Sequence, residues 1–357
     1  MYLDRFQHLN IFKRTRVPEL SSGVLRMHRN EKITNWPEAL RKEILGTLPD
    51  NFLQCYPNHR PFYRRLSEFL DLPETRFVVT SGIDEAAKNL LILCCAPGDK
   101  YAAVWPGYAM YKVYGEMLRA SMTPISYDPH HFMSPEELLA TIPEGCKLLF
   151  LPNPSQPVEN YFSPEDMRHI AQSCAKRDIL FAVDEAYHFF GSETAIPLTN
   201  EFENVLVLRT FSKAFGSGCL RLGYVVGSEK GLAPFAAFRI AHEANALTYH
   251  VGSILLDYYD DFVIQSIAEI CEGRNFFREQ CLADGLNAWG RFSNFVLAEF
   301  DTKETADTVT RWLETNNIFV RGYQQGKLEK TIMVTCGPID TMRRVSGLIR
   351  EMIGKGK

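Results

Sequence analysis

The stretch that decides how this chain folds reads Arg209-Thr210-Phe211-Ser212-Lys213-Ala214-Phe215-Gly216. It follows an apolar run at 205–208, and another apolar run at 179–183 ends in Asp184. Short runs that are almost wholly apolar are typical of strands covered on both faces of a parallel sheet. Polar residues that follow such strands gather at the carboxyl edge of the sheet. We therefore expect Asp184 and Thr210 to lie at one site.

The same pattern extends over the first two thirds of the chain, where short β-rich runs alternate with helical segments. The expected strands are residues 77–80, 101–105, 122–126, 148–151, 180–184, 205–209 and 222–227, and the helical patterns between them include 84–95, 164–176 and 231–247. This alternation predicts an α/β fold with a doubly wound, mostly parallel seven-stranded sheet.

After about His250 the pattern changes to that of a compact α+β unit. Its expected elements are a long helix at 257–282, strands at 294–300, 318–321 and 332–335, a helix near 305–315 and a final helix at 339–352. The segment before about Asn35 has no strong pattern and could pack against this unit. We therefore expect a large domain at 36–250 and a small domain made of 1–35 and 251–357.

The composition excludes several classes of function. The chain has 357 residues and a net charge of −4, which argues against a nucleic-acid-binding surface. No apolar run approaches the length that spans a membrane, and the first residues lack the order of a signal peptide. Nine cysteines without metal-like spacing predict reduced thiols, no metal site and a cytoplasmic setting.

The residues around Lys213 suit one cofactor, pyridoxal phosphate. The lysine amine can form a Schiff base with the cofactor aldehyde. The hydroxyls of Thr210 and Ser212 and the guanidinium of Arg221 can hold its phosphate. The carboxylate of Asp184 can pair with its pyridinium nitrogen. Together these residues point to pyridoxal-phosphate chemistry, although none of them does so alone.

With these residues the chain resembles the fold-type I pyridoxal-phosphate enzymes of the aspartate aminotransferase superfamily (class I/II), nearest to the histidinol-phosphate aminotransferase branch. The resemblance runs from Asn30 to the last helix. It implies that Lys213 carries the Schiff base and moves a proton between substrate and cofactor. It also implies that Asp184 keeps the ring nitrogen protonated, and that Tyr187 donates a hydrogen bond to the phenolic oxygen of the cofactor.

The turn at 80–85 is a second expected phosphate contact, because it follows a strand and opens a helix, where backbone N–H groups can point at an anion. Gly82 permits a close approach, and the resemblance implies that the amides of Ile83 and Asp84 meet the phosphate. Tyr108 resembles the aromatic residue that stacks on the pyridine face. Tyr56 resembles the tyrosine that reaches the partner subunit's cofactor phosphate, which implies a homodimer with shared active sites.

One departure from the family pattern concerns the ring oxygen of the cofactor. Family members usually carry an Asn-Pro-Thr-Gly segment whose asparagine contacts that oxygen. Counting back from the next helix start puts Gln156 at this position, with Asn153 as the competing assignment. The glutamine amide can also donate a hydrogen bond, but from a different distance to the backbone.

A second departure concerns the substrate. The family's late strand carries an arginine that forms a fork with the substrate α-carboxylate. Counting back from Gly337 puts Met333 in that place, and a methionine cannot bind a carboxylate. A slip of one or two residues in the alignment would let Lys330 or Arg321 serve instead. Otherwise the substrate is held differently from that of an ordinary amino-acid transaminase.

The remaining substrate contacts and the reaction type stay open. Arg321 is the best substrate anchor, and His28 and Arg29 are further candidates in a segment that resembles the stretch closing over the site. The leading function is an aminotransferase acting on a small amino acid or amine. A decarboxylase, eliminase or cyclase is the alternative, because Met333 and Gln156 replace the usual residues. The full set around Lys213 argues against a binding protein without chemistry.

Overall fold

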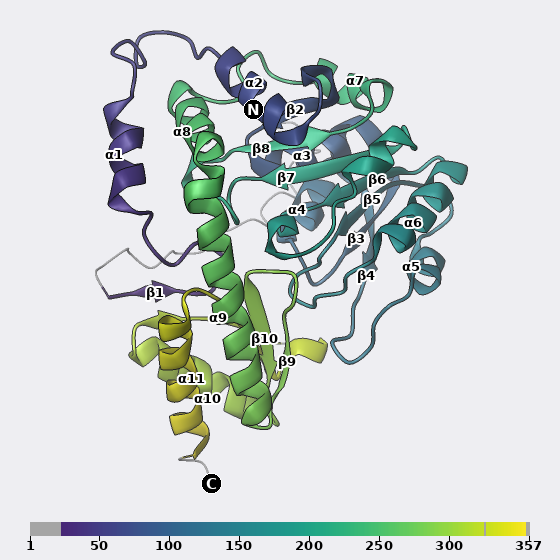
Figure 1. Ribbon diagram of the computed structural model, residues 1–357. Helices are drawn as coiled ribbons and strands as arrows, with labels where there is room; N and C mark the ends of the chain where they lie inside the picture. Colours follow the sequence, from purple (N-terminus) through teal and green to yellow (C-terminus); the bar gives the residue numbers. More distant parts are fainter. Residues whose placement is uncertain (1–22, 325, 355–357) are drawn as a thin grey trace, which may run out of the picture.

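The computed structural model describes residues 23–324 and 326–354 and arranges them around two main sheets (Figure 1). The larger sheet has the order β2-β8-β7-β6-β5-β3-β4. Its strands are β2 (Phe77–Thr80), β3 (Lys100–Val104), β4 (Ser121–Ile125), β5 (Cys146–Pro152), β6 (Leu180–Asp184), β7 (Val205–Thr210) and β8 (Gly223–Val226). The strand β8 alone runs antiparallel to the other strands of this sheet. The predicted α/β fold with a mostly parallel seven-stranded sheet is therefore confirmed.

Helices cover both faces of the large sheet, because alternate strand residues point to opposite sides. On β5, Leu149 and Leu151 belong to one core cluster, whereas Leu148 and Phe150 belong to the other. The first cluster includes side chains of α2 (Arg60–Leu70), α5 (Pro135–Thr141), α6 (Pro164–Lys176) and α8 (Ala246–Asp257). The second includes side chains of α3 (Gly82–Cys94), α4 (Ala109–Leu118) and α7 (Glu229–Ala237). Apolar cover on both faces explains why these strands read as nearly continuous apolar runs.

The helix expected at 231–247 is wrong as a single element. The helix α7 ends at Ala237, and α8 begins at Ala246. The side chain of Asn245 accepts a hydrogen bond from the backbone N–H of Thr248, so it caps a new helix instead of continuing the old one. This cap also explains why the next helical stretch begins before the expected residue 257.

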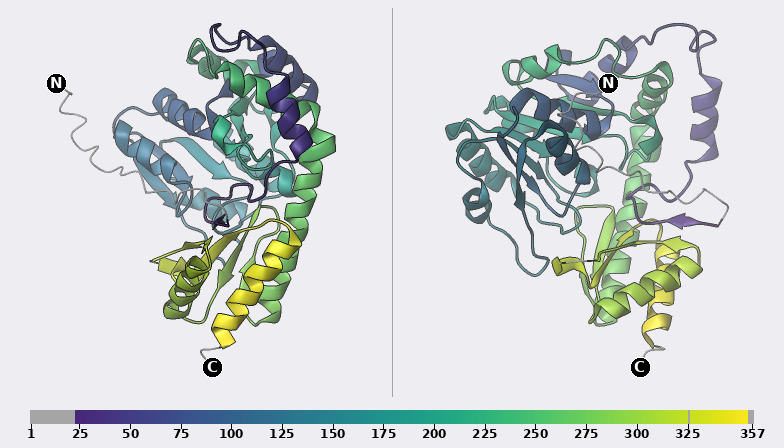
Figure 2. Two further views of the ribbon diagram at one scale, coloured as in Figure 1. Left: turned by 90° about the vertical axis from the view of Figure 1, so that its left-hand side faces the viewer. Right: turned by 180° about the vertical axis from the view of Figure 1, so that it is seen from behind.

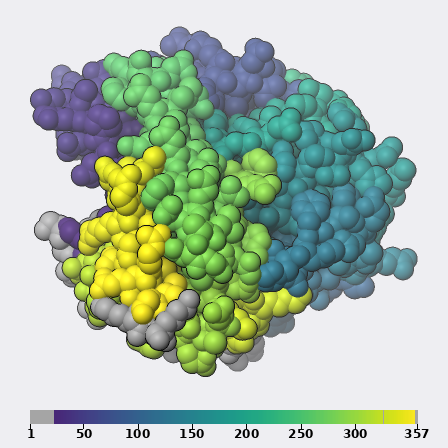
Figure 3. All heavy atoms as spheres, turned by 60° about the horizontal axis from the view of Figure 1, so that its bottom comes forward, coloured from purple at the N-terminus to yellow at the C-terminus, as the bar shows by residue number. Residues whose placement is uncertain are grey.

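The smaller sheet is antiparallel and has the order β12-β13-β10-β9. Its strands are β9 (Asn287–Trp289), β10 (Phe295–Glu299), β12 (Arg321–Gly322) and β13 (Thr331–Thr335). The helices α9 (Ile264–Ala283), α10 (Lys303–Thr315) and α11 (Ile339–Gly354) complete this unit. Figure 3 shows α11 lying along α9 on the outer surface. The predicted elements are present with one exception, because the strand expected at 318–321 is divided into β11 (Ile318–Phe319), which belongs to another sheet, and β12. The short strand β9 is an addition.

The beginning of the described chain also packs on this unit. The strand β1 (Leu25–Arg26) pairs in parallel with β11 (Ile318–Phe319), and Met27 is buried in the smaller core. The helix α1 (Glu38–Gly46) then leads back toward α8. Residues 1–22, which the sequence assigns to the small domain, lie outside the described residues.

A nearly continuous helical rod joins the two sheets (Figures 1 and 2). It consists of α8, a π-helical turn at Tyr259–Val263 and α9. The rod crosses the expected domain boundary near residue 250 without a loop, so the division into two domains stays a prediction. No helix in the described part of the chain is long and apolar enough to cross a membrane.

Candidate active site

A cavity of about 530 Å³ opens at the carboxyl ends of β5, β6 and β7. Pro152, Asp184 and Thr210, the last residues of these strands, all line it. The cavity also brings together most of the predicted site residues: His28, Ile83, Asp84, Tyr108, Gln156, Asp184, Tyr187, Thr210, Ser212, Lys213, Arg221 and Arg321. Gly82 and Tyr56 are not among the residues that line it, and Tyr56 is exposed on the surface.

Lys213 extends into this cavity from the turn after β7. Its Nζ donates a hydrogen bond to the backbone carbonyl of Arg29 at 2.9 Å and lies 5.9 Å from the ring centroid of Tyr187. The side chain is half-buried among the residues that line the cavity. This desolvation lowers the pKa of Lys213 to about 8, with a further lowering by Arg221 and an opposing effect of Glu31. The lowered pKa therefore gives Lys213 a larger neutral fraction near neutral pH than an exposed lysine has.

This pKa predicts how cofactor uptake depends on pH. Because only the neutral amine attacks an aldehyde, the rate of pyridoxal phosphate uptake by the apoenzyme is expected to rise with pH and level off above the pKa of Lys213, about 8. The sign follows from deprotonation, since the neutral fraction grows about tenfold per pH unit below the pKa. Stopped-flow absorption from pH 6 to 10 measures this profile. A rate that kept rising to pH 10 would contradict it.

Asp184 is a buried carboxylate at the end of β6. The hydroxyl of Tyr111 donates a hydrogen bond to one of its oxygens, and the backbone N–H of Ala186 donates to the other at 2.9 Å. Burial raises the pKa of Asp184, because the charged form is desolvated. No Lys, Arg or His of the described chain forms a salt bridge with it. A buried carboxylate of this kind suits a cationic group such as a protonated ring nitrogen.

Three side chains form a polar cluster at the end of β7. Thr210 Oγ1 donates to Ser212 Oγ at 2.9 Å, and Arg221 Nη1 donates to the same Ser212 oxygen at 3.4 Å. Arg221 Nη2 also pairs with the carboxylate of Asp84 at 3.2 Å. Two hydroxyls and a guanidinium form a donor set that fits a phosphate.

The turn before α3 leaves room for that cluster. Gly82 has a φ of +72°, and a Cβ at this position would lie 2.9 Å from Arg221 Nη2. Ile83 and Asp84 follow it in the first turn of α3 and line the cavity, where the backbone N–H groups at a helix start favour an anion. The absence of a side chain at Gly82 thus lets the guanidinium and the helix start meet.

Two tyrosines face the centre of the cavity. The hydroxyl of the buried Tyr187 accepts a hydrogen bond from Asn30 Nδ2 at 2.8 Å, which leaves its own proton free to donate. Tyr108 directly precedes α4, and its hydroxyl donates to Asp84. Its ring meets Tyr111 edge-on, with 5.3 Å between centroids. These contacts therefore hold both rings in place.

The structure separates the two candidates for the ring-oxygen contact. Gln156 lines the cavity, and its Nε2 lies 3.4 Å from the sulfur of Met333. The Asn153 side chain instead exchanges two hydrogen bonds with the backbone of Phe162, each of 2.9 Å. This buried pairing holds the loop closed and turns the asparagine away from the cavity, which favours Gln156.

The residue selected by counting back from Gly337, Met333, lies in the cavity. Met333 is wholly buried on β13 and lines the cavity, and its register partner on β12 is Arg321. Lys330 lies before the strand and does not line the cavity, and its carbonyl accepts a hydrogen bond from the backbone N–H of Phe300.

Tyr56 does not reach the cavity of its own chain, because it is 84% exposed and stacks on His242.

Sequence reasoning missed several residues that support the site. Tyr111 could have been found, since it follows Tyr108 by three residues and therefore shares a helix face with it. The sequence gives no such signal for Asn30, because its partner Tyr187 comes from a distant segment. It gives none for Tyr323 either, because its partner Met333 lies on a neighbouring strand.

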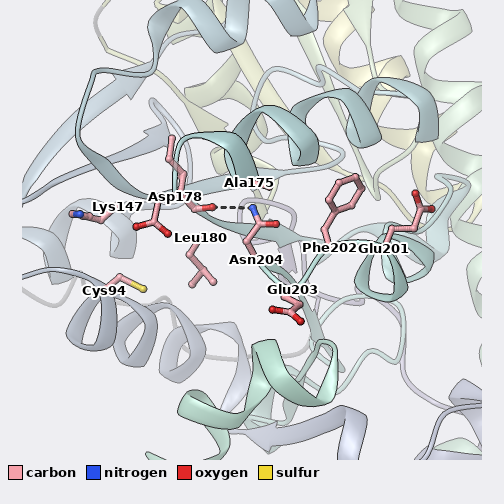
Figure 4. Close-up of a pocket in the computed structure, with 10 residues that line it drawn as sticks. Cys94, Lys147, Ala175, Asp178, Leu180, Glu201, Phe202, Glu203 and Asn204 are labelled. Atoms are coloured by element: carbon pink, nitrogen blue, oxygen red, sulfur yellow. Dashed lines mark hydrogen bonds between the residues drawn. The ribbon is translucent and has the colours of Figure 1, made fainter.

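A second hollow, of about 470 Å³, lies at the opposite edge of the large sheet (Figure 4). It is lined at the amino ends of β6 and β7, where the Asn204 side chain donates to the Ile179 carbonyl at 2.9 Å. Polar residues there point in different directions and do not converge on one point. The cavity at the carboxyl edge is therefore the candidate active site.

Comparison with known proteins decides the family. The family model described as Aminotransferase class I and II matches residues 15–347. The chain belongs to this family. As a class I and II aminotransferase, it is a pyridoxal-phosphate-dependent enzyme that acts on an amino acid or amine.

The relatives confirm the resemblance to the histidinol-phosphate aminotransferase branch. Histidinol-phosphate aminotransferase from Thermoanaerobacter sp. is 28% identical over 333 residues, which cover 92% of this chain and 93% of the relative. Histidinol-phosphate aminotransferase 1 from Trichormus variabilis is 24% identical over 338 residues, or 94% of each protein.

Two solved structures share the fold of this aminotransferase. Histidinol-phosphate aminotransferase from Sinorhizobium meliloti, in complex with pyridoxal-5'-phosphate, has a TM-score of 0.83 at 20% identity and covers 93% of this chain and 92% of its own. L-threonine-O-3-phosphate decarboxylase from Porphyromonas gingivalis has a TM-score of 0.75 at 18% identity and covers 93% and 99%. The fold thus also carries a decarboxylase, so fold alone does not choose the reaction.

Proposed function

We propose that this aminotransferase moves an amino group from a small amine or amino acid to an oxo acceptor, with Lys213 as the residue that binds the cofactor aldehyde and moves the proton. The observation that carries the proposal is the position of the Lys213 amine. It lies in the same cavity as the buried carboxylate of Asp184 and the phosphate-like donor set around Arg221.

Some residues of the cavity would act on the cofactor, and Lys213 would move the proton. When bound, pyridoxal phosphate supplies an aldehyde that joins to an amine and a ring that draws away the electron pair left by a departing proton. The carboxylate of Asp184 would hold a proton on the ring nitrogen. The amine of Lys213 would move the proton between the substrate carbon and the cofactor.

The remaining predicted residues orient the ring. Tyr108 would stack on one face and keep water away from it. Tyr187, held by Asn30, and Gln156 would donate hydrogen bonds to the ring oxygen. The phosphate would be held by Gly82, Ile83 and Asp84 at the helix start, with Thr210, Ser212 and Arg221. His28 and Arg321 contact the substrate from the mouth of the cavity.

A two-stage experiment tests this function. Addition of a reactive amine to the holoenzyme is expected to convert the cofactor to pyridoxamine phosphate, visible by absorption and mass, and an oxo compound should reverse the change. Sustained turnover without an acceptor, with release of carbon dioxide or ammonia, would instead establish the alternative of a decarboxylase, eliminase or cyclase.

We also propose a homodimer with shared active sites in the cytoplasm. Tyr56 is 84% exposed, and Leu53 and Leu45 nearby in sequence are 81% and 70% exposed. Large apolar side chains so exposed are typical of a surface that another chain covers. All nine cysteines are free thiols, which supports a reducing compartment.

Mixed dimers are expected to reveal the role of Tyr56. The variant Tyr56→Ala should raise the Kd for pyridoxal phosphate by about 10- to 100-fold, the range for a lost hydrogen bond to a charged group. A dimer that pairs this variant with a Lys213→Ala subunit contains one site with both residues intact, so mixing should restore about half of the wild-type activity per such dimer. Activity that stayed at the level of the separate variants would contradict the shared site.

A further inference from the structure

A third cavity, of about 300 Å³, lies between loops of the large sheet and the smaller unit. The loop after β4 contributes Phe132, and the loop after β5 contributes Tyr161. From the smaller unit, Arg278 on α9 and Trp289 on β9 line it. Among the described residues, none lines both this cavity and the active-site cavity. Small ligands often bind in cavities of this size at the boundary between two structural units.

Aromatic side chains from both sides line this third cavity. They are Phe132, Tyr161, Trp289 and Phe292. The ring centroids of Tyr161 and Phe292 lie 4.4 Å apart, so this pair joins the loop after β5 to the smaller unit. Phe132 is 55% exposed, and much of its ring is therefore free to contact another molecule. Such a lining favours a ligand with a flat apolar ring.

Arg278 gives the cavity a cation without a partner. Its Nε is buried, and no described residue accepts a hydrogen bond from it. Its guanidinium also forms no salt bridge with an acid of the described chain. A buried donor without an acceptor is costly, and the cost is larger when the donor is charged. An anion in the cavity would supply the acceptor, since a guanidinium binds a carboxylate through two parallel hydrogen bonds.

The acids that line the cavity are already engaged by other groups. Asp128 accepts a hydrogen bond from Lys327 Nζ at 2.7 Å, and the two form an ion pair. Glu159 accepts from the backbone N–H of Phe292 at 2.9 Å and from Ser293 Oγ at 2.7 Å. Neither carboxylate forms a salt bridge with Arg278. The acids of the wall therefore do not neutralise this arginine by direct contact.

The remaining charges favour an anion with a single negative charge. Arg291 also lines the cavity, and its exposed side chain has no ion-pair partner among the described residues. His131, a further lining residue, is paired with Glu137 at 3.0 Å. Arg278 and Arg291 thus face one carboxylate without a cationic partner, that of Glu159. A net positive cavity attracts a ligand of the opposite charge.

We propose that this cavity is a binding site for an aromatic carboxylate. The carboxylate of the ligand would pair with the guanidinium of Arg278, and its ring would pack on Phe132 and Trp289. The bound molecule would contact the loops of the large sheet and the smaller unit at the same time. The site is separate from the active site, so this inference does not depend on the proposed reaction.

Three probes test the proposal on the holoenzyme. Benzoate carries both the ring and the charge, benzyl alcohol keeps the ring without the charge, and acetate keeps the charge without the ring. Calorimetric titration is expected to give benzoate a Kd at least about tenfold lower than that of either other probe, since each lacks one of the two contacts. A Kd for benzyl alcohol or acetate equal to that of benzoate would overturn the proposal.

One variant on each side of the cavity locates the bound benzoate. Arg278→Gln, in the smaller unit, is expected to raise the Kd of benzoate by about 10- to 100-fold and to leave that of benzyl alcohol unchanged. Phe132→Ala, in the loop after β4, should raise both Kd values by about 2- to 10-fold, the range for an aromatic contact. Unchanged benzoate binding in both variants would overturn the proposal.

A control in the other cavity excludes binding at the active site. Arg321→Met removes a cation that lines the active-site cavity, and it should leave the Kd of benzoate unchanged. Benzoate binding that is lost in Arg321→Met but kept in Arg278→Gln would place the carboxylate in the active site and overturn the proposal. Phe132→Ala changes an exposed side chain, so it decides the question even if Arg278→Gln does not fold.

Discussion

Replacing Lys213 with alanine is expected to lower the rate of amino-group transfer by at least about 10²- to 10⁴-fold, the contribution of one positioned acid–base group. Among the described residues that line the cavity, it is the lysine whose amine can take that role. The variant should also lose its covalent bond to the cofactor. Steady-state rates measure the first effect, and borohydride reduction followed by peptide mass measurement shows the second.

A matched control makes the Lys213 result specific. Lys176 is exposed at the end of α6, so Lys176→Ala should keep both the activity and the covalent bond. Cofactor-dependent transfer that survived in Lys213→Ala would refute the proposed role. A cofactor adduct on a peptide without Lys213 would refute it as well.

The variant Asp184→Asn is expected to reduce the transfer rate by about 10²- to 10³-fold, the usual effect of removing one preorganised electrostatic partner. The amide has nearly the same shape but cannot balance a protonated ring nitrogen. The apoenzyme of this variant should melt at the wild-type temperature or above it, because a buried carboxylate without a salt bridge is costly when ionised. Kinetics of the holoenzyme and calorimetry of the apoenzyme measure the two effects.

The opposite directions of these effects distinguish a functional from a structural role of Asp184. An apoenzyme that melted well below the wild type would indicate that the carboxylate mainly supports the fold. Asp301→Asn, at an exposed acid outside the cavity, is the control and should change neither quantity.

The large sheet was predictable because burial on both faces requires apolar strands. Residues 148–151 are apolar without interruption, and the structure places alternate residues of this run in two different cores. Parallel strands end at the same edge of a sheet, so Asp184 and Thr210 both line the cavity there, as expected. By contrast, β9 (Asn287–Trp289) is short and half exposed, and nothing in its sequence marks it as a strand.

The supporting contacts were less predictable because they join distant segments. The hydrogen bond between Asn30 and Tyr187 spans 157 residues, and no local pattern specifies it. The single helix expected at 231–247 was wrong for a different reason. The cap at Asn245 begins a new helix, and this local hydrogen bond outweighs the helical pattern of the segment.

The hydrogen bond between Lys213 and the carbonyl of Arg29 links cofactor binding to the position of the segment around Arg29. In its proposed role Lys213 joins the cofactor aldehyde, and its nitrogen would then keep at most one of its hydrogens for this carbonyl. Loading would therefore weaken or remove the contact with Arg29, whose neighbours at 25–27 are anchored to the smaller unit through β11. The loaded and the empty enzyme would then differ in how this segment is held to the turn after β7.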